Sequence, residues 1–279
     1  MLSEKPWKPV DFAVIMAVLG SILLAGAFSG MVGSRESEAA EPRNPTVNFI
    51  ISFLLYGAIL ILVHIMVRRR GASWRTAFGL ASPRRGSALF MAVGVTLMIL
   101  PIAWGLGIIS AVLMEKIHMT PVLQQSIQTL QNSPSVESRV YLAILAVIVA
   151  PITEEVMFRG ILYPYIRHLG YRRIAMLGTA IVFGAIHFNM MHFVPLTFLG
   201  VVLAWLYETT DNLLAPIIAH GVFNLTNFLQ TVIETSNWTM ISILCFAVGG
   251  IVTGIMVLFR QPNVGQNDPI VSGPNDERI

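Results

Sequence analysis

The chain alternates between long apolar runs and short polar stretches. A helix that crosses a bilayer needs about 20 mostly apolar residues, and eight runs come near this length. They occupy residues 10–32, 47–67, 87–113, 139–157, 174–191, 193–207, 213–233 and 239–259. The fifth and sixth runs almost merge and the seventh carries several polar residues, so the pattern allows seven or eight spans. We favour eight.

This pattern predicts an all-α fold, a polytopic integral membrane helical bundle with about eight transmembrane helices. We expect residues 1–260 to form a single transmembrane domain and residues 261–279, rich in Pro, Gly, Asn and Asp, to form a disordered cytoplasmic tail. The polar segment 115–138 is expected to form an interfacial helix or cap on the outer side. Because Lys5 and Lys8 precede the first run, a cleaved signal peptide is an alternative there. The length of that run and the spans that follow favour a membrane helix.

Composition and charge support a membrane protein. Of the 279 residues, 55% are hydrophobic and 12% charged, and mean hydropathy is +0.71, outside the usual range of soluble domains. The net charge of +3 and the pI near 9.2 would suit nucleic acid, but basic residues of membrane proteins gather in cytoplasmic loops. The lone Cys245 can form no intrachain disulfide.

The distribution of basic residues predicts the orientation. With the N-terminus inside, 14 of the 18 Lys and Arg residues fall on the cytoplasmic side. They are Lys5, Lys8, Arg68, Arg69, Arg70, Arg75, Arg84, Arg85, Arg159, Arg167, Arg172, Arg173, Arg260 and Arg278. We therefore expect both termini in the cytoplasm, the plasma membrane of a prokaryote as the location, membrane lipids as the surroundings and no nucleic-acid partner.

Three groups of polar residues lie inside the predicted spans, where ionisable side chains are costly and mark functional sites. They contain Glu154, Glu155 and Arg159 in the fourth run, His187 in the fifth, and His220 and Asn224 in the seventh. Each group alone has a structural explanation: a salt-bridged helix end, a hydrogen-bonded packing histidine, or polar contacts between helices. Their occurrence together in one small membrane domain favours a functional site.

Helix geometry gives these residues different expected roles. Residues four apart share a helix face and adjacent ones do not, so Glu155 can pair with Arg159 while Glu154 points elsewhere. Glu154 has no local cation and is the better candidate for a general base. His220 and Asn224 are also four apart, and an imidazole and an amide on one face suit an oxyanion hole.

With these residues the chain resembles the CAAX protease and bacteriocin-processing family of integral membrane proteins, which includes the type II prenyl-protein (Ras-converting) endopeptidases. The resemblance covers about residues 140–230. The family motifs E-E-x-x-x-R, F-x-x-x-H and H-x-x-x-N correspond to Glu154-Glu155 with Arg159, Phe183 with His187, and His220 with Asn224. Their order on successive predicted spans makes the set specific.

The resemblance implies an intramembrane glutamate endopeptidase whose cavity opens toward the cytoplasm. Glu154 and His187 would activate a water, His220 and Asn224 would stabilise the oxyanion, and no metal would be needed. Glu155 and Arg159 match the remaining motif positions, and the helix geometry makes them an orienting pair. The expected partner is a peptide or protein substrate, for which a prenylated C-terminal tail is the best-known example in the family.

Several alternatives stay open from the sequence. One glutamate and two histidines also match some hydrolytic zinc sites, although no H-E-x-x-H motif is present. A non-catalytic immunity or scaffold protein is the other alternative. His192 lies close enough to His187 to be a second-tier candidate. The predicted spans also place Glu154 near the cytoplasmic end of its span and His187 near the opposite end of the next one, in conflict with a single site.

Overall fold

The structure is a computed structural model that describes residues 7–33, 45–80, 85–131, 135–233 and 237–258. Within those residues every regular element is a helix, which confirms the predicted all-α class. The elements are α1 (Pro9–Gly33), α2 (Pro45–Arg69), α3 (Trp74–Ala77), α4 (Arg85–Lys116), α5 (Gln125–Gln131), α6 (Val136–Ile144), η2 (Leu145–Val149), α7 (Ala150–Glu155), η3 (Val156–Leu162), α8 (Tyr163–His168), α9 (Arg172–Ala185), α10 (Met190–Thr210), α11 (Leu214–Val232) and α12 (Trp238–Leu258). The predicted tail, 261–279, lies outside the described residues.

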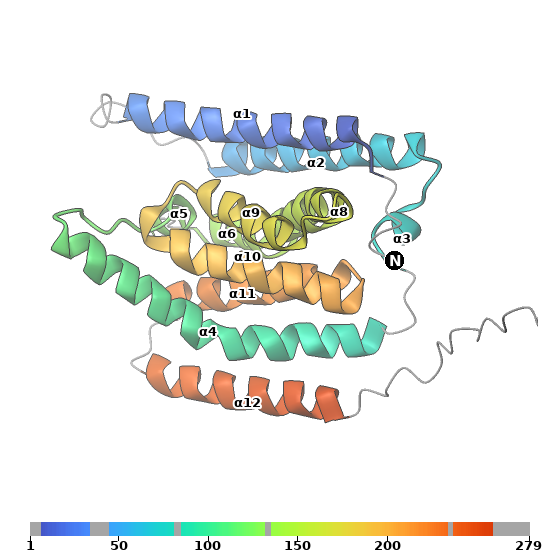
Figure 1. Ribbon diagram of the computed structural model, residues 1–279. Coiled ribbons are helices and arrows are strands. Elements are labelled where there is room, and N and C mark those ends of the chain that lie inside the picture. Colours follow the sequence, from blue (N-terminus) through green and yellow to red (C-terminus); the bar gives the residue numbers. More distant parts are fainter. Residues whose placement is uncertain (1–6, 34–44, 81–84, 132–134, 234–236, 259–279) are drawn as a thin grey trace, which may run out of the picture.

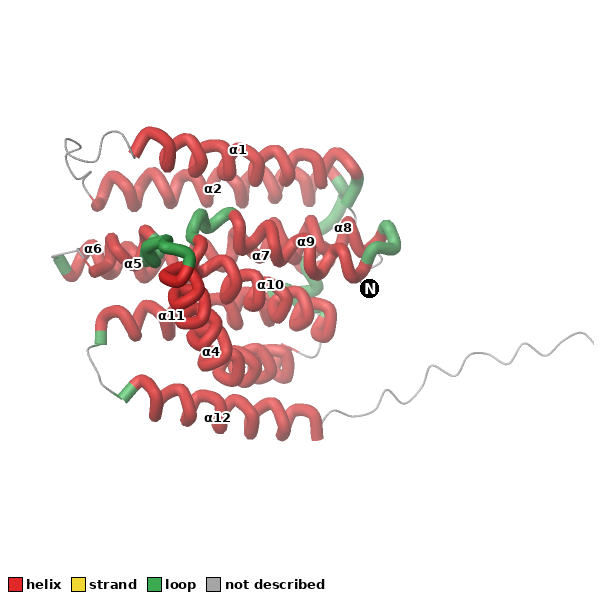
Figure 2. Tube along the Cα trace, turned by 60° about the vertical axis from the view of Figure 1, so that its left-hand side comes forward, coloured by secondary structure: helices red, strands yellow, loops and turns green. Residues whose placement is uncertain are grey.

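The helices form a layered bundle. α1 and α2 lie along one edge, and α12 packs on α4 at the opposite edge (Figure 1). Helix α10 occupies the middle, in contact with α4, α9 and α11. The view in Figure 2 shows the same order of layers, with α7, α9, α10 and α11 between the two edges. Elements from residues 150 to 232 therefore lie between the two edges of the bundle.

Five helices among the described residues are long and apolar enough to cross a membrane. They cover Thr46–Arg69, Ala88–Lys116, Val136–His168, Met190–Thr210 and Trp238–Ile255. On α2 and α12 most large apolar side chains are exposed, as expected for helices that face lipid. The chain is an integral membrane protein, while the predicted count of eight spans is not confirmed. α9 has only 14 residues, and α11, with 19, does not meet the same criterion.

The fourth predicted span is longer than its apolar run. It was expected at 139–157, but α6, η2, α7, η3 and α8 follow one another without a break as one 33-residue helix, Val136–His168. We call this the central helix. Two of its segments, η2 and η3, are π-helical and flank the short α7. Such π segments are rare and often occur at functional sites, and here they flank the two glutamates.

The fifth predicted span ends earlier than expected. It was placed at 174–191, but α9 stops at Ala185. Phe188 adopts a left-handed backbone, with φ of 49°, and the side chain of Asn189 caps α10 by accepting from the backbone N–H of His192, 2.9 Å away. These local conformations break the apolar run before α10 begins.

The early end of α9 removes the conflict over the depth of the site. At a rise of about 1.5 Å per residue, α9 is roughly 21 Å long, and His187 lies two residues beyond its end. Glu154 precedes His168, the end of the central helix, by 14 residues, again roughly 21 Å. The two residues therefore lie at a similar distance from the turn between α8 and α9. His187 does follow the far end of its helix, whereas the predicted placement of Glu154 near the end of its helix was wrong.

Candidate functional site

A buried ion pair lies at the centre of the candidate site. Arg159 Nη1 donates to Glu155 Oε1 at 2.9 Å, and both side chains are fully buried. Arg159 Nη2 donates to the backbone carbonyl of Gly200 on α10, 2.7 Å away. The predicted pairing of Glu155 with Arg159 is therefore present, and the pair also joins the central helix to α10.

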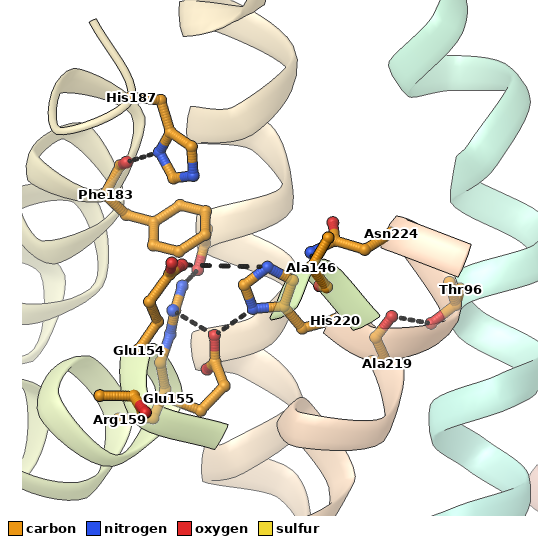
Figure 3. A network of polar contacts seen from close by, with 12 residues as sticks. Thr96, Ala146, Glu154, Glu155, Arg159, Phe183, His187, Ala219, His220 and Asn224 are labelled. Atoms are coloured by element: carbon orange, nitrogen blue, oxygen red, sulfur yellow. Dashed lines mark hydrogen bonds and ion pairs between the residues drawn. The ribbon is translucent and has the colours of Figure 1, made fainter. Parts of the chain in front are cut away.

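His220 brings α11 into the same network (Figure 3). Its Nδ1 lies 3.0 Å from Glu155 Oε1, and its Nε2 lies 4.0 Å from Glu154 Oε2. Because a carboxylate paired with Arg159 can only accept, Nδ1 is the protonated nitrogen that donates to Glu155. Glu155 therefore fixes the tautomer and orientation of His220, while the other ring nitrogen faces Glu154.

Glu154 differs from its neighbour in having little support. Its side chain is 12% exposed, against none for Glu155. The Oε2 atoms of both glutamates are buried without a hydrogen-bond partner, but Glu155 is held through its Oε1 and Glu154 is not. Burying a polar atom without a partner is costly. The structure thus contains a carboxylate with an unused acceptor at the position that the sequence nominated for the general base.

His187 reaches this network through Phe183. Its Nδ1 donates to the carbonyl of Phe183, 2.7 Å away, which leaves Nε2 as the acceptor nitrogen. The Phe183 ring makes edge contacts with His187 and with His220, at centroid distances of 5.1 and 5.4 Å. Between His187 and the two glutamates, all of them described residues, no hydrogen bond or ion pair is present. His187 is near the cluster without touching it.

Asn224 lies one turn beyond His220 on α11. Its Nδ2 donates to the backbone carbonyl of Ala146 in η2, 2.8 Å away. An amide nitrogen carries two hydrogens, so one N–H is still available. The structure therefore places all six predicted residues in one region, with Glu154, Glu155, Arg159 and His220 in a contiguous network and His187 and Asn224 beside it.

His187 also borders a cavity of about 380 Å³. Its lining comes from the end of α4, residues 119–128 and the turn before α10, and includes Met114, Met119, Met190 and Met191. The end of α4, beside which this cavity lies, is on the side of the bundle opposite α3 and α8 (Figure 1). The resemblance implies an opening at the other, cytoplasmic end, so the direction from which a substrate arrives stays a prediction.

Zinc binding was an alternative from the sequence, and His192 was a second-tier candidate. In the part of the chain that the structure covers, no three or more His, Cys, Asp and Glu side chains are grouped so that they could hold a metal ion. His192 Nδ1 contacts Asn189 Oδ1 at 2.9 Å, within the first turn of α10. His192 therefore belongs to a helix cap and is not part of the network.

The sequence named Phe183 as a motif position without giving it a role, and it did not identify the carbonyls of Gly200 and Ala146 as contributors to the site. The four-residue spacing of Phe183 and His187 could have indicated the role of Phe183, because it allows a side chain to reach the carbonyl one turn earlier. The other two are backbone groups of neighbouring helices, for which the sequence carries no direct signal.

Comparisons with known proteins cover this region. Residues 136–226 match the family model described as type II CAAX prenyl endopeptidase Rce1-like. An 81-residue stretch is 33% identical to a protein of Bacillus subtilis (strain 168) named "Putative membrane peptidase YdiL". The stretch covers 29% of this chain and 33% of that relative, so the chain spans about a third of the length of the curated relative that it matches. No solved structure matches the chain.

The matched segment contains all six predicted site residues and runs from α6 into α11. It coincides with the range in which the three motifs were found. The predicted resemblance is therefore confirmed: residues 136–226 are similar to the type II CAAX prenyl endopeptidase Rce1-like family.

Proposed function

We propose that this chain is an intramembrane endopeptidase that hydrolyses a peptide bond with a water activated by Glu154. The observation that carries the proposal is that the two adjacent glutamates have different contacts. Glu155 is fully buried and its Oε1 is bound by both Arg159 and His220, whereas Glu154 is partly exposed and its Oε2 lies beside His220 without a hydrogen bond. A general base needs such an unengaged acceptor within reach of the reacting water.

In the proposed reaction Glu154 takes a proton from the water as its oxygen attacks the scissile carbonyl. His187 orients the same water through Nε2, the nitrogen that remains an acceptor while Nδ1 donates to Phe183. The proton held by Glu154 then passes to the leaving amine as the peptide bond breaks, so the carboxylate is regenerated.

His220 and Asn224 are proposed to stabilise the oxyanion. Asn224 would use the N–H that Ala146 does not occupy. For His220 to donate from Nε2 as well as from Nδ1, the ring must be the imidazolium, and the carboxylate of Glu155 lies 3.0 Å away to balance that charge. Donors fixed before the reaction stabilise developing charge better than mobile water does.

The substrate proposed is a peptide or protein segment in or beside the membrane, with a prenylated C-terminal tail as the specific case that the family match suggests. We also propose a prokaryotic plasma membrane with both termini in the cytoplasm, because the predicted spans then place 13 of the 18 basic residues on that side, without the buried Arg159.

A comparison of membrane proteomes tests the function. Cells that express the wild type should accumulate cleaved peptides that are missing from cells with Glu154→Gln at equal protein level. Identical peptide patterns in the two strains would favour the non-catalytic immunity or scaffold alternative.

The zinc alternative is tested on the purified protein. We expect full cleavage of a responsive peptide in the presence of a strong chelator, with no stoichiometric zinc found by elemental analysis. Activity that disappears with chelator and returns with added zinc would replace the glutamate mechanism by a metal-dependent one.

A further inference from the structure

Pro151 leaves two carbonyls of the central helix without their usual donors. Proline has no N–H, so it cannot donate to the carbonyl four residues earlier in an α-helix or five residues earlier in a π-helix. For Pro151 those carbonyls belong to Val147 and Ala146, both in η2. The N–H of Ala150, the α-helical donor for Ala146, donates to Leu145. The carbonyl of Ala146 is therefore open to a donor from another helix.

Helix α11 docks on both of these carbonyls. Asn224 Nδ2 donates to Ala146 at 2.8 Å. Gly221, three residues earlier on α11, lies so near η2 that an added Cβ would be 2.8 Å from the carbonyl oxygen of Val147. Only glycine permits this approach without a shift of the helices. The two contacts lie within the four residues that follow His220, which contacts Glu155.

We infer that Pro151 is a positioning residue for Asn224. By leaving the Ala146 carbonyl without a backbone donor, Pro151 provides an acceptor that holds one amide hydrogen of Asn224 and fixes the direction of the other. An N–H at position 151 would compete with Asn224 for the carbonyls of η2 and would let the amide rotate. The inference deepens the proposed function and rests on the oxyanion role assigned there to Asn224.

The central helix also contains a matched control. Pro164, next to η3, has no N–H for the carbonyl of Gly160, four residues earlier, and that carbonyl accepts from Trp7 Nε1 at 2.6 Å. As at Pro151, a proline leaves a carbonyl without a backbone donor and a side chain from elsewhere donates to it. Here that side chain is Trp7, which precedes α1 and is not one of the six candidate residues. Pro164→Ala should therefore change how α1 is held and leave catalysis alone.

The test measures kcat, KM and thermal unfolding of purified full-length protein in detergent micelles, with an internally quenched peptide that the wild type cleaves. Pro151→Ala is expected to lower kcat about tenfold or more, as small misplacements of catalytic groups do, with little change in KM. Its unfolding temperature should not fall, because alanine favours a helix interior over proline. Pro164→Ala should keep the wild-type kcat.

A double-mutant cycle separates positioning from a general structural effect. In an Asn224→Ala background, Pro151→Ala should cause no further loss of kcat. Gly221→Ala displaces α11 from the same turn while keeping Pro151, and its loss of kcat should likewise disappear in the Asn224→Ala background. This variant replaces Pro151→Ala in the cycle if Pro151→Ala does not fold. A wild-type kcat in Pro151→Ala, or an equal loss in both backgrounds, would overturn the inference while the proposed function stands. A wild-type rate in Asn224→Ala would overturn both.

Discussion

At the residue scale, the adjacent glutamates show how position on a helix decides chemistry. They are chemically identical, but consecutive helical residues point about 100° apart. Glu155 Oε1 is bound by Arg159 and His220, whereas Glu154 Oε2 lies 4.0 Å from the other ring nitrogen of His220 and accepts no hydrogen bond. Glu155 therefore shapes the site, and Glu154 is the residue that is free to react.

Glu155→Ala should lose both stability and activity. Removing one member of a buried ion pair leaves the other charge uncompensated, at a cost of about 3–5 kcal/mol, and His220 loses its acceptor. The double variant Glu155→Ala/Arg159→Met should recover most of the lost stability, because the orphaned charge is gone, yet remain inactive. Thermal unfolding in detergent and peptide cleavage report the two effects separately.

Recovery of cleavage in that double variant would show that Glu155 serves only to neutralise Arg159. Unchanged stability in the single variant would contradict the buried pairing itself.

At the scale of elements, α10 must approach α9 closely for Gly200 to meet Arg159. An added Cβ at Gly200 would lie 2.9 Å from both Cα and Cβ of Ala180 on α9. Gly178, on α9, is a matched control because the nearest atom to its added Cβ is 4.0 Å away. The two glycines lie in neighbouring helices and differ in the space around them.

Gly200→Ala is expected to destabilise the protein by about 1–3 kcal/mol, since the new methyl group forces packed helices apart, and to lower activity by moving the acceptor of Arg159. Gly178→Ala should be neutral or stabilising by up to about 1 kcal/mol, the usual helix preference of alanine over glycine. Chemical or thermal unfolding of both variants gives the comparison. Equal effects at the two positions would contradict the close contact of α9 with α10.

The positions of the helices could be predicted only where the pattern of apolar residues determines them. The apolar runs located the helices, and the four-residue spacings correctly paired Glu155 with Arg159. The end of α9 was wrong because Phe188 and the Asn189 cap break an otherwise apolar run through local backbone conformation. Neither the π segments nor the contact of Asn224 with Ala146 was predicted. Hydrophobic periodicity does not reveal which backbone carbonyls lack a donor.

At the scale of the whole molecule, the sequence predicted a membrane bundle with one polar centre, and the layered structure has that form. Elements from residues 150 to 232 are enclosed between the α1–α2 edge and the α4–α12 edge (Figures 1 and 2). What the apolar pattern could not provide is the number of crossings, because α9 and α11 owe their place to packing around the site and not to long apolar runs.

The orientation of the bundle can be tested with single cysteines in a Cys245→Ala background. Thr120→Cys, between α4 and α5, should react with a membrane-impermeant maleimide on intact cells. His168→Cys, at the end of α8 near Arg167 and Arg172, should react only after permeabilisation, because basic residues are retained in the cytoplasm. The reverse labelling pattern would show that the bundle is inverted.

The central claim is that Glu154 is the base that activates water, and Glu154→Gln tests it most directly. Glutamine keeps the size of the side chain and removes its ability to take a proton. With purified protein and a peptide that the wild type cleaves, we predict that kcat falls by about 10²–10⁴, the usual contribution of a general base, while the unfolding temperature does not drop. Turnover near the wild-type rate in Glu154→Gln would contradict the account.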